Sequence, residues 1–185
     1  RLDLRQADDR AVLVDLLGKA DILVHGYRAD ALDRLGLGAG ERQRIRPGLV
    51  DVSLDAYGWT GPWARRRGFD SLVQMSAGIA AEGMRCYQAE RPKPLPVQAL
   101  DHAAGFIMAA CAVRGLTARG ETGRGSIWRT SLARVAEFLA AMPAESLDGS
   151  LSAPGPADFA GGAEEQTGWG PGRRLPPPLR IDDAP

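Results

Sequence analysis

Two short apolar runs, each followed by glycine, constrain the fold of this chain most. They are "DILVHG" (21–26) and "LVDVSLDAYG" (49–58), and both have the length and apolar content of buried strands. Helical patterns precede and separate them, in "DDRAVLVDLLGKA" (8–20), "RADALDRLGLG" (28–38) and "GERQRIRPG" (40–48). Because helices and strands alternate along the chain, the sequence predicts an α/β fold with a parallel sheet and flanking helices.

The second half of the chain continues this alternation and then changes character. A helix is predicted over 69–83, a long helix rich in small residues over 98–120, a third strand over 126–131 and a further helix over 132–142. Glycine and proline make 58–68 a loop and 82–97 a connector. After residue 142 the chain is rich in Gly, Pro, Ala and Ser. We therefore expect an α/β domain over 1–142 and an irregular Pro/Gly-rich arm or linker over 143–185.

Charge and composition exclude several classes of protein. Lys plus Arg and Asp plus Glu both number 23, so the formal net charge is zero, which argues against a general binder of nucleic acid or membrane surfaces. Nearly all the positive charge is arginine, which favours carboxylate and phosphate as ligands. Two cysteines without CxxC spacing and two histidines predict no metal site. Without a signal peptide or a long apolar run, we expect a cytoplasmic protein.

Arginine is concentrated in two places, and both follow a predicted strand. Arg28 and Arg34 bracket a short helix after the first strand, and a run of three arginines (65–67) lies in the loop after the second. In open α/β sheets, ligands bind beyond the carboxyl ends of the strands, so both groups are expected to face one crevice. Phosphate is a suitable ligand for such a site. A solvated charged surface is the alternative interpretation.

Asp101 stands near the start of the long helix, in a mostly apolar run that predicts burial. It is either the N-cap of that helix or a nucleophilic carboxylate that attacks an activated acyl group. A dyad with His102 is disfavoured, because adjacent residues on a helix face different directions. His25 ends a predicted buried strand and is interpreted as a core or loop residue. Trp59 and Trp63 are interpreted as packing residues beside a turn.

Four segments, taken together, resemble the family III CoA-transferases, the CaiB/BaiF family. They are "ADILVHGYRADALDRLGL", "GWTGPWARRRGFDSLVQMSAG", "PVQALDHAAGFIMAACAVRGL" and "TGRGS" followed by "SLARVAEFL", in the family's order and separations. The family pattern "ENFRPGxLxRLGL" stands here as "HGYRADALDRLGL". The resemblance implies a Rossmann-like large domain and the transfer of CoA between carboxylic acids. In that mechanism an aspartate forms a mixed anhydride and then an aspartyl-CoA thioester.

The resemblance also implies which residues act. The catalytic position matches Asp101, whose carboxylate we expect to lie in an apolar wall and to be held by amides at the helix start. Coenzyme A, as acyl-CoA, is the implied substrate, and no metal is implied. The CoA-contacting positions of the family match Leu2, Asp3, Leu4, Arg5, Gly26, Tyr27, Arg28, Arg34, Arg67, Gly68 and Phe69.

The resemblance covers part of the family only. The family's first strand and its adenine loop precede position 1, and its glycine-rich covering loop follows position 185, so we expect weak or no turnover from these 185 residues alone. Implied partners are an acyl-CoA, a carboxylic acid, and a second copy or a complementary family III chain. A non-catalytic remnant with partial CoA binding is the alternative. An α-methylacyl-CoA racemase is disfavoured, because Phe69 stands where those enzymes have histidine.

Overall fold

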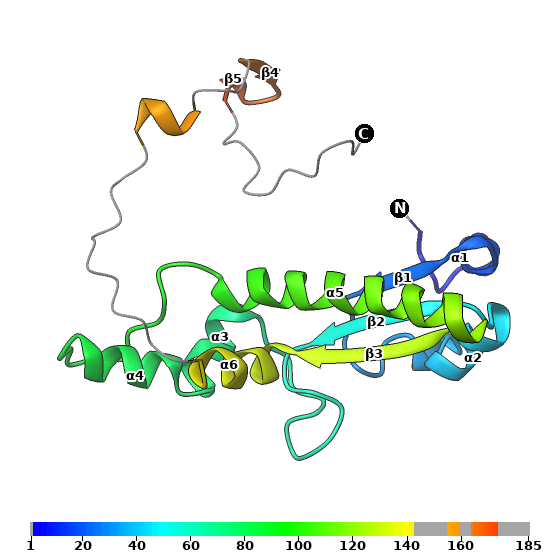
Figure 1. Ribbon diagram of the computed structural model, residues 1–185, viewed down its shortest axis with the longest axis horizontal. Helices are drawn as coiled ribbons and strands as arrows, with labels where there is room; N and C mark the ends of the chain where they lie inside the picture. The colour runs from blue at the N-terminus through cyan, green and yellow to red at the C-terminus, as the bar shows by residue number, and fades with distance from the viewer. Residues whose placement is uncertain (1, 143–154, 160–163, 174–185) are drawn as a thin grey trace. The chain divides into compact units, whose positions relative to one another are not determined.

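The computed structural model of the chain describes residues 2–142, 155–159 and 164–173 (Figure 1). Two units are distinguished, 1–142 and 143–185, and each is described by itself. In the second unit the structure describes the short helix η2 (Pro156–Phe159) and an antiparallel pair, β4 (Glu165–Thr167) and β5 (Gly170–Gly172). This pair lies where the sequence predicted an irregular arm. Its turn uses Gly170 at a φ of +106°, a conformation that glycine adopts at little cost.

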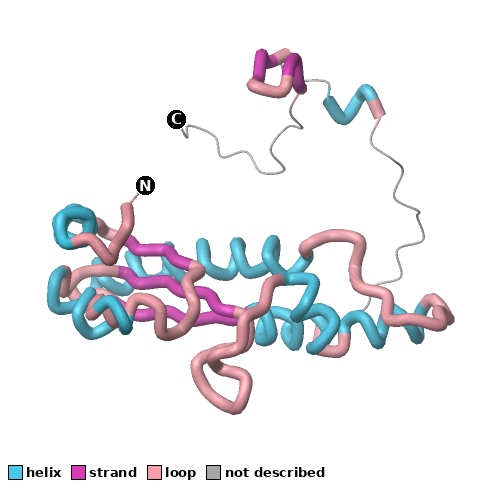
Figure 2. Tube along the Cα trace, turned by 180° about the vertical axis from the view of Figure 1, so that it is seen from behind, coloured by secondary structure: helices cyan, strands magenta, loops and turns pink. Residues whose placement is uncertain are grey.

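The first unit contains a three-stranded parallel sheet (Figure 2). Its strands are β1 (Ile22–His25), β2 (Val50–Asp55) and β3 (Ser126–Ser131), in the order β1-β2-β3. Both neighbouring pairs are parallel, with Val52 of β2 beside Val24 and Trp128. The predicted strands and the predicted parallel α/β sheet are therefore confirmed.

Helices flank the sheet, but the segment predicted to be helical over 28–38 contains only a three-residue 3-10 helix, and the connector predicted over 82–97 starts inside a helix that ends at Cys86. The helices are α1 (Ala7–Lys19), η1 (Asp33–Leu35), α2 (Ala39–Ile45), α3 (Asp70–Ser76), α4 (Ile79–Cys86), α5 (Ala99–Thr122) and α6 (Leu132–Ala140). The single helix predicted over 69–83 was wrong, because α3 and α4 are separate helices. Gly78 interrupts the helical backbone with a φ of +91°.

The long helix α5 packs directly on the sheet. Val50 and Val52 of β2 contact Met108 and Ala112 of α5 in one apolar cluster. At Gly115 the helix approaches so closely that an added Cβ would lie 2.4 Å from Val50 Cγ1. A second cluster joins α3, α5 and α6 and consists of Ala56, Val73, Leu100, Ala104, Leu132, Val135 and Ala136. These two clusters fix where the start of α5 lies relative to the ends of the strands.

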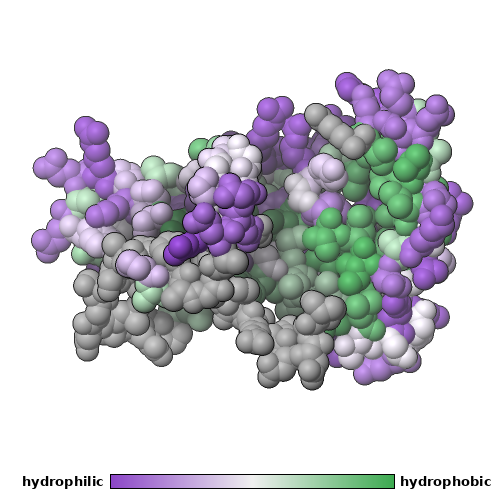
Figure 3. Space-filling view, turned by 90° about the horizontal axis from the view of Figure 1, so that it is seen from above, coloured by the Kyte–Doolittle hydropathy of each residue, from purple (hydrophilic) through white to green (hydrophobic). Residues whose placement is uncertain are grey.

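Within the described part of the chain only one face of α5 is covered, which corrects the expectation of a buried helix. Phe106 and Val113 are 69% and 66% exposed. By length and composition α5 also passes the test for a membrane-spanning helix, and it is the one helix in the described part of the chain that does so. Core helices of soluble proteins pass the same test, so this is weak evidence. Figure 3 shows apolar side chains gathered in a patch on the face seen there.

The opposite face of β2 is polar and holds a buried ion pair. Arg42 of α2 donates from Nε to Asp51 Oδ2 at 2.8 Å and from Nη1 to the Leu37 carbonyl oxygen at 2.6 Å. Both charged side chains are buried. His25 lies beside the pair, and its burial, reinforced by the Arg42 charge, lowers its pKa. His25 is thus a partly buried residue at the end of β1, which agrees with the core or loop role expected from the sequence.

Replacing Arg42 by alanine is expected to destabilise the fold by about 3–5 kcal/mol, because Asp51 would be left charged, buried and unpaired. Arg44 on the same helix is the matched control, since its side chain is 76% exposed and pairs with Glu41 at the surface. Arg44→Ala should change the free energy of unfolding by less than about 1 kcal/mol. Urea unfolding of the two variants measures the difference. Equal losses would contradict the assigned importance of the buried pair.

Candidate functional site

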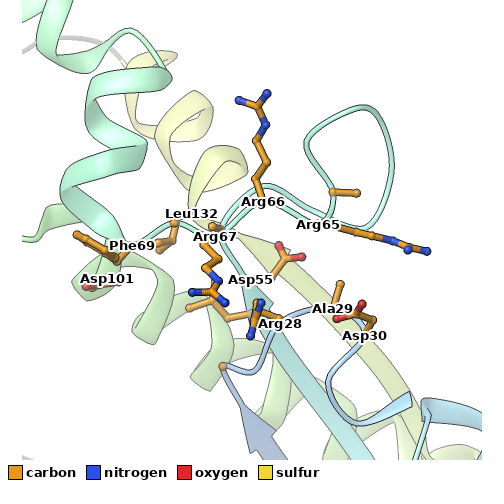
Figure 4. Close-up of a pocket in the computed structure, with 15 residues that line it drawn as sticks. Arg28, Ala29, Asp30, Asp55, Arg65, Arg66, Arg67, Phe69, Asp101 and Leu132 are labelled. Atoms are coloured by element: carbon orange, nitrogen blue, oxygen red, sulfur yellow. The ribbon is translucent and has the colours of Figure 1, made fainter. Parts of the chain in front are cut away.

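A cavity of about 450 Å³ lies at the carboxyl edge of the sheet (Figure 4). All three strands end there, so the expectation of a crevice at this edge is confirmed. The loop after β2 and the first turn of α5 complete the wall. The lining residues are Gly26, Arg28, Ala29, Asp30, Leu54, Asp55, Ala56, Ala64, Arg65, Arg66, Arg67, Gly68, Phe69, Asp101 and Leu132.

Four arginines line the cavity, and none of them forms an ion pair within the described residues; Arg28 and Arg67 are the two that point together. Figure 4 shows the guanidinium groups of Arg28 and Arg67 pointing toward the same part of the cavity. Within the described residues, neither side chain forms an ion pair. Arg66, in contrast, points away and lies 4.3 Å from the centre of the Trp63 ring. Unpaired guanidinium groups above a sheet edge form a suitable site for phosphate or carboxylate.

The other predicted arginine, Arg34, is not among the residues that line this cavity. Its guanidinium forms an ion pair with Asp30 at 2.6 Å, one turn earlier in the chain. The side chain of Arg34 is 74% exposed. Each of the two predicted arginine groups therefore contributes at least one residue to the cavity, Arg28 from the first and Arg67 from the second. Arg34 is not among the lining residues.

Asp101 lines the same cavity, but its local geometry differs from both expectations. The N-cap of α5 is Gln98, so Asp101 lies within the first turn and the N-cap interpretation was wrong. Asp101 is an exposed residue, although its carboxyl is partly shielded from water. No described group donates a hydrogen bond to its carboxylate, so the expected hold by helix-start amides was also wrong. The amide of Asp101 instead donates to Asp70 Oδ2 at 2.9 Å.

Asp70 is the important residue that the sequence patterns did not reveal. It begins α3, is almost fully buried, and its carboxylate serves as an acceptor for the free amide at the start of α5. Its other oxygen accepts from Gln74 Nε2. Gln74 also donates to the Val97 carbonyl oxygen at 3.0 Å and accepts from the Leu95 amide at 2.8 Å, which ties down the connector before α5. The only signal in the sequence was an aspartate directly after the candidate residues Gly68 and Phe69.

Asp101 is more basic than an ordinary aspartate. Partial burial raises the pKa of its carboxyl, the neighbouring Asp70 charge raises it further, and His102 opposes both effects. A carboxylate of raised basicity is a better nucleophile toward an acyl group. Asp101 thus lines the same cavity as the guanidinium groups of Arg28 and Arg67.

Three of the remaining candidate residues line a neighbouring cavity of about 580 Å³. Leu2, Leu4 and Tyr27 line it, together with side chains of α1 and β1. Asp3 and Arg5 are not among its lining residues and pair with each other at 2.7 Å. Residues 26–28 stand between the two cavities, because Gly26 and Arg28 line the first and Tyr27 the second. Among the described residues, no cluster of three or more His, Cys, Asp or Glu side chains is placed to hold a metal ion.

Known proteins place this chain in one family. The family model for CoA-transferase family III matches residues 1–164. An acetyl-CoA:oxalate CoA-transferase of Acetobacter aceti is 37% identical over 78 residues, which are 42% of this chain and 20% of that protein. The alpha subunit of a succinyl-CoA–L-malate CoA-transferase of Chloroflexus aurantiacus is 33% identical over 96 residues, which are 52% and 21% of the two chains.

Solved structures agree with this relationship. A crystal structure of Rv3272 from Mycobacterium tuberculosis superposes with a TM-score of 0.70 at 28% identity, covering 76% of this chain and 39% of that one. A CaiB/BaiF family protein from Brucella suis gives a TM-score of 0.67 at 25% identity, with 76% and 36% covered. The chain therefore spans less than half the length of these relatives. With a matching family model over most of its length and this shared fold, the chain belongs to CoA-transferase family III.

Proposed function

We propose that this chain supplies the CoA-binding edge and the nucleophile of an enzyme that transfers CoA between carboxylic acids. One observation carries the proposal: Asp101 and two unpaired arginines, Arg28 and Arg67, line one cavity at the carboxyl edge of the sheet. The arginines would bind phosphate groups of CoA, and the neighbouring apolar cavity with Leu2 and Tyr27 would receive a further part of the molecule.

The proposed reaction begins at the Asp101 carboxylate. One carboxylate oxygen attacks the thioester carbonyl of acyl-CoA, and the thiolate of CoA leaves, which gives a mixed anhydride. The thiolate then attacks the Asp101 carbonyl, releasing the donor acid as its carboxylate and forming an aspartyl-CoA thioester. An acceptor carboxylate attacks that thioester and displaces the CoA thiolate, which gives a second mixed anhydride. The thiolate then attacks the acceptor's carbonyl carbon, which forms the acceptor's CoA thioester and releases the Asp101 carboxylate. No step requires a proton to be taken from carbon, which agrees with Phe69 in the wall, a side chain that cannot carry one.

The proposal extends to partners and location. One relative in Chloroflexus aurantiacus consists of alpha and beta subunits, which supports pairing of this chain with a second copy or with a complementary family III chain. The acids that exchange CoA would be carboxylic acids of the kind named for the relatives, such as oxalate or malate. A cytoplasmic location stays a prediction. CoA binding without turnover would support the non-catalytic alternative instead.

Arg28→Ala and Arg67→Ala should each weaken CoA binding by about 1.5–3 kcal/mol, the scale of a charge-assisted hydrogen bond. Isothermal titration calorimetry with CoA at fixed salt measures the effect. Arg114→Ala is the matched control, because Arg114 is exposed on α5 and does not line the cavity. If all three variants bind CoA with the affinity of the wild type, the arginines are part of a solvated surface.

The complete protein, given acetyl-CoA or succinyl-CoA, should form an adduct on Asp101 that hydroxylamine converts to a hydroxamate, detectable by peptide mass spectrometry. Asp101→Asn should lose the adduct and remain folded, because Asp70 rather than Asp101 accepts the free amide at the start of α5. Normal CoA transfer by the Asn variant would overturn the mechanism. A wild type that binds CoA without any adduct would establish the non-catalytic alternative.

Asp70→Asn should move the acidic limb of the kcat/KM profile to lower pH. In the wild type, activity falls as pH decreases through the pKa of Asp101, which is raised by burial and by Asp70. Asparagine keeps an oxygen acceptor for the Asp101 amide but removes the charge, so Asp101 stays ionised to lower pH. The profile of the complete protein between pH 3 and 8 tests this, and an unmoved limb, or a shift to higher pH, contradicts the proposed coupling.

A further inference from the structure

The loop that carries the cavity arginines, residues 57–69, is held together partly by its own side chains. The edge of the Trp63 ring meets Tyr57 with ring centres 5.1 Å apart and an angle of 83° between the planes. Arg66 lies over Trp63 on the loop itself. These contacts stabilise the shape of the loop, but they do not fix its position relative to the sheet.

The start of the loop is fixed by Asp55, the last residue of β2. Its Oδ1 accepts a hydrogen bond from the Gly58 amide at 2.6 Å, and Gly58 adopts a φ of +86°. The other end of the loop returns to the same place, because a Cβ added at Gly68 would lie 2.7 Å from Ala56 Cβ. Both ends of the loop therefore meet at the end of β2, and a small shift there displaces Arg67.

Arg129 of β3 is placed to hold this junction against the sheet. In the parallel register Asp55 stands beside Ser131, so Arg129 lies two residues earlier on the same face of the sheet. Its guanidinium carbon lies 5.4 Å from the centre of the Trp59 ring, within the range of a cation–π contact. Its charge also lowers the pKa of the Asp55 carboxyl, opposing the larger effect of burial, which raises it.

Arg129 has no carboxylate partner at ion-pair distance in the part of the chain that the structure describes. It also does not line the cavity that holds Asp101. Its side chain is therefore used neither by a surface ion pair nor by the proposed reaction, and its closest aromatic partner, Trp59, is the first loop residue after Gly58.

We propose that Arg129 is a positioning residue for the anion cavity: with its guanidinium over Trp59 and beside Asp55, it fixes the arginine loop to the sheet and so sets the place of Arg67. The effect on ligand binding rests on the proposed function, whereas the effect on the loop does not. Because Arg129 does not line the cavity that holds Asp101, removing the Arg129 side chain should change the affinity for CoA and leave the rate of the chemical step unchanged.

The loop provides its own test, because trypsin cleaves after arginine and residues 65–67 are three arginines in a row. Arg129→Met keeps most of the side-chain length and removes the charge. Cleavage within 65–67 in the native protein should accelerate about three- to fivefold, which corresponds to the loss of one exposed cation–π contact. Arg124→Met is the matched control, since Arg124 is an exposed arginine on the turn before β3. Like Arg129→Met, this substitution removes one trypsin cleavage site.

Substitutions of the ring separate positioning from a general loss of stability. Trp59→Phe keeps an aromatic face, so trypsin should cleave this variant at nearly the wild-type rate. Trp59→Ala should be cleaved as fast as Arg129→Met. All variants should keep the wild-type far-ultraviolet circular dichroism and unfold in one transition. Equal cleavage rates for Arg129→Met and Arg124→Met would overturn the proposal, as would equal rates for the two Trp59 variants.

Calorimetry with CoA completes the test. Arg129→Met should raise the Kd for CoA about three- to fivefold, with kcat of the complete protein unchanged. A weaker Kd without faster loop cleavage would overturn the proposal, because Arg129 would then contact the ligand directly. If the wild type does not bind CoA while the cleavage differences hold, the assignment of CoA fails and the positioning role of Arg129 stands.

Discussion

The packing of β2 on both faces is the constraint on which the rest of the first unit depends. Val50 and Val52 fix α5 on one face, and Gly115 allows the close approach that this contact requires. Asp51 holds Arg42 of α2 on the other face. With β1 and β3 parallel on either side, three strands end together, and the loops that follow them must share one edge. The cavity is a consequence of this arrangement.

Asp70 connects that arrangement with the proposed reaction. It occupies the position of a structural acceptor, since it satisfies a free amide at the start of α5. The same carboxylate places a negative charge next to Asp101 and raises its pKa. One buried residue thereby connects the loop with the arginines, the start of α5 and the basicity of the proposed nucleophile. Asp101 is exposed at the cavity wall rather than buried in an apolar one, as the proposed attack on an acyl group requires.

Arginines in and around the sheet have several different roles. Arg42 is buried and structural, Arg66 is held by an aromatic ring, and Arg34 is paired with a nearby acid. Arg28 and Arg67 remain without a carboxylate in the described part of the chain. An excess of arginine over lysine in a chain of zero net charge is therefore compatible with several roles, and residue type alone does not distinguish them.

The sequence by itself determined the elements of the sheet, the position of the long helix and the family resemblance. The spacing of apolar residues and the glycines that end each run are local properties. They can be recognised in consecutive residues such as 21–26 and 49–58. Gly78 showed the limit of such patterns, since one glycine inside a helical run either continues the helix or breaks it. Only the tertiary structure decided that Asp70 accepts the Asp101 amide, that Arg34 lies outside the cavity and that Arg129 reaches Trp59. Each of these depends on which side chains from distant segments come within a few ångströms, and that is set by packing rather than by any local pattern.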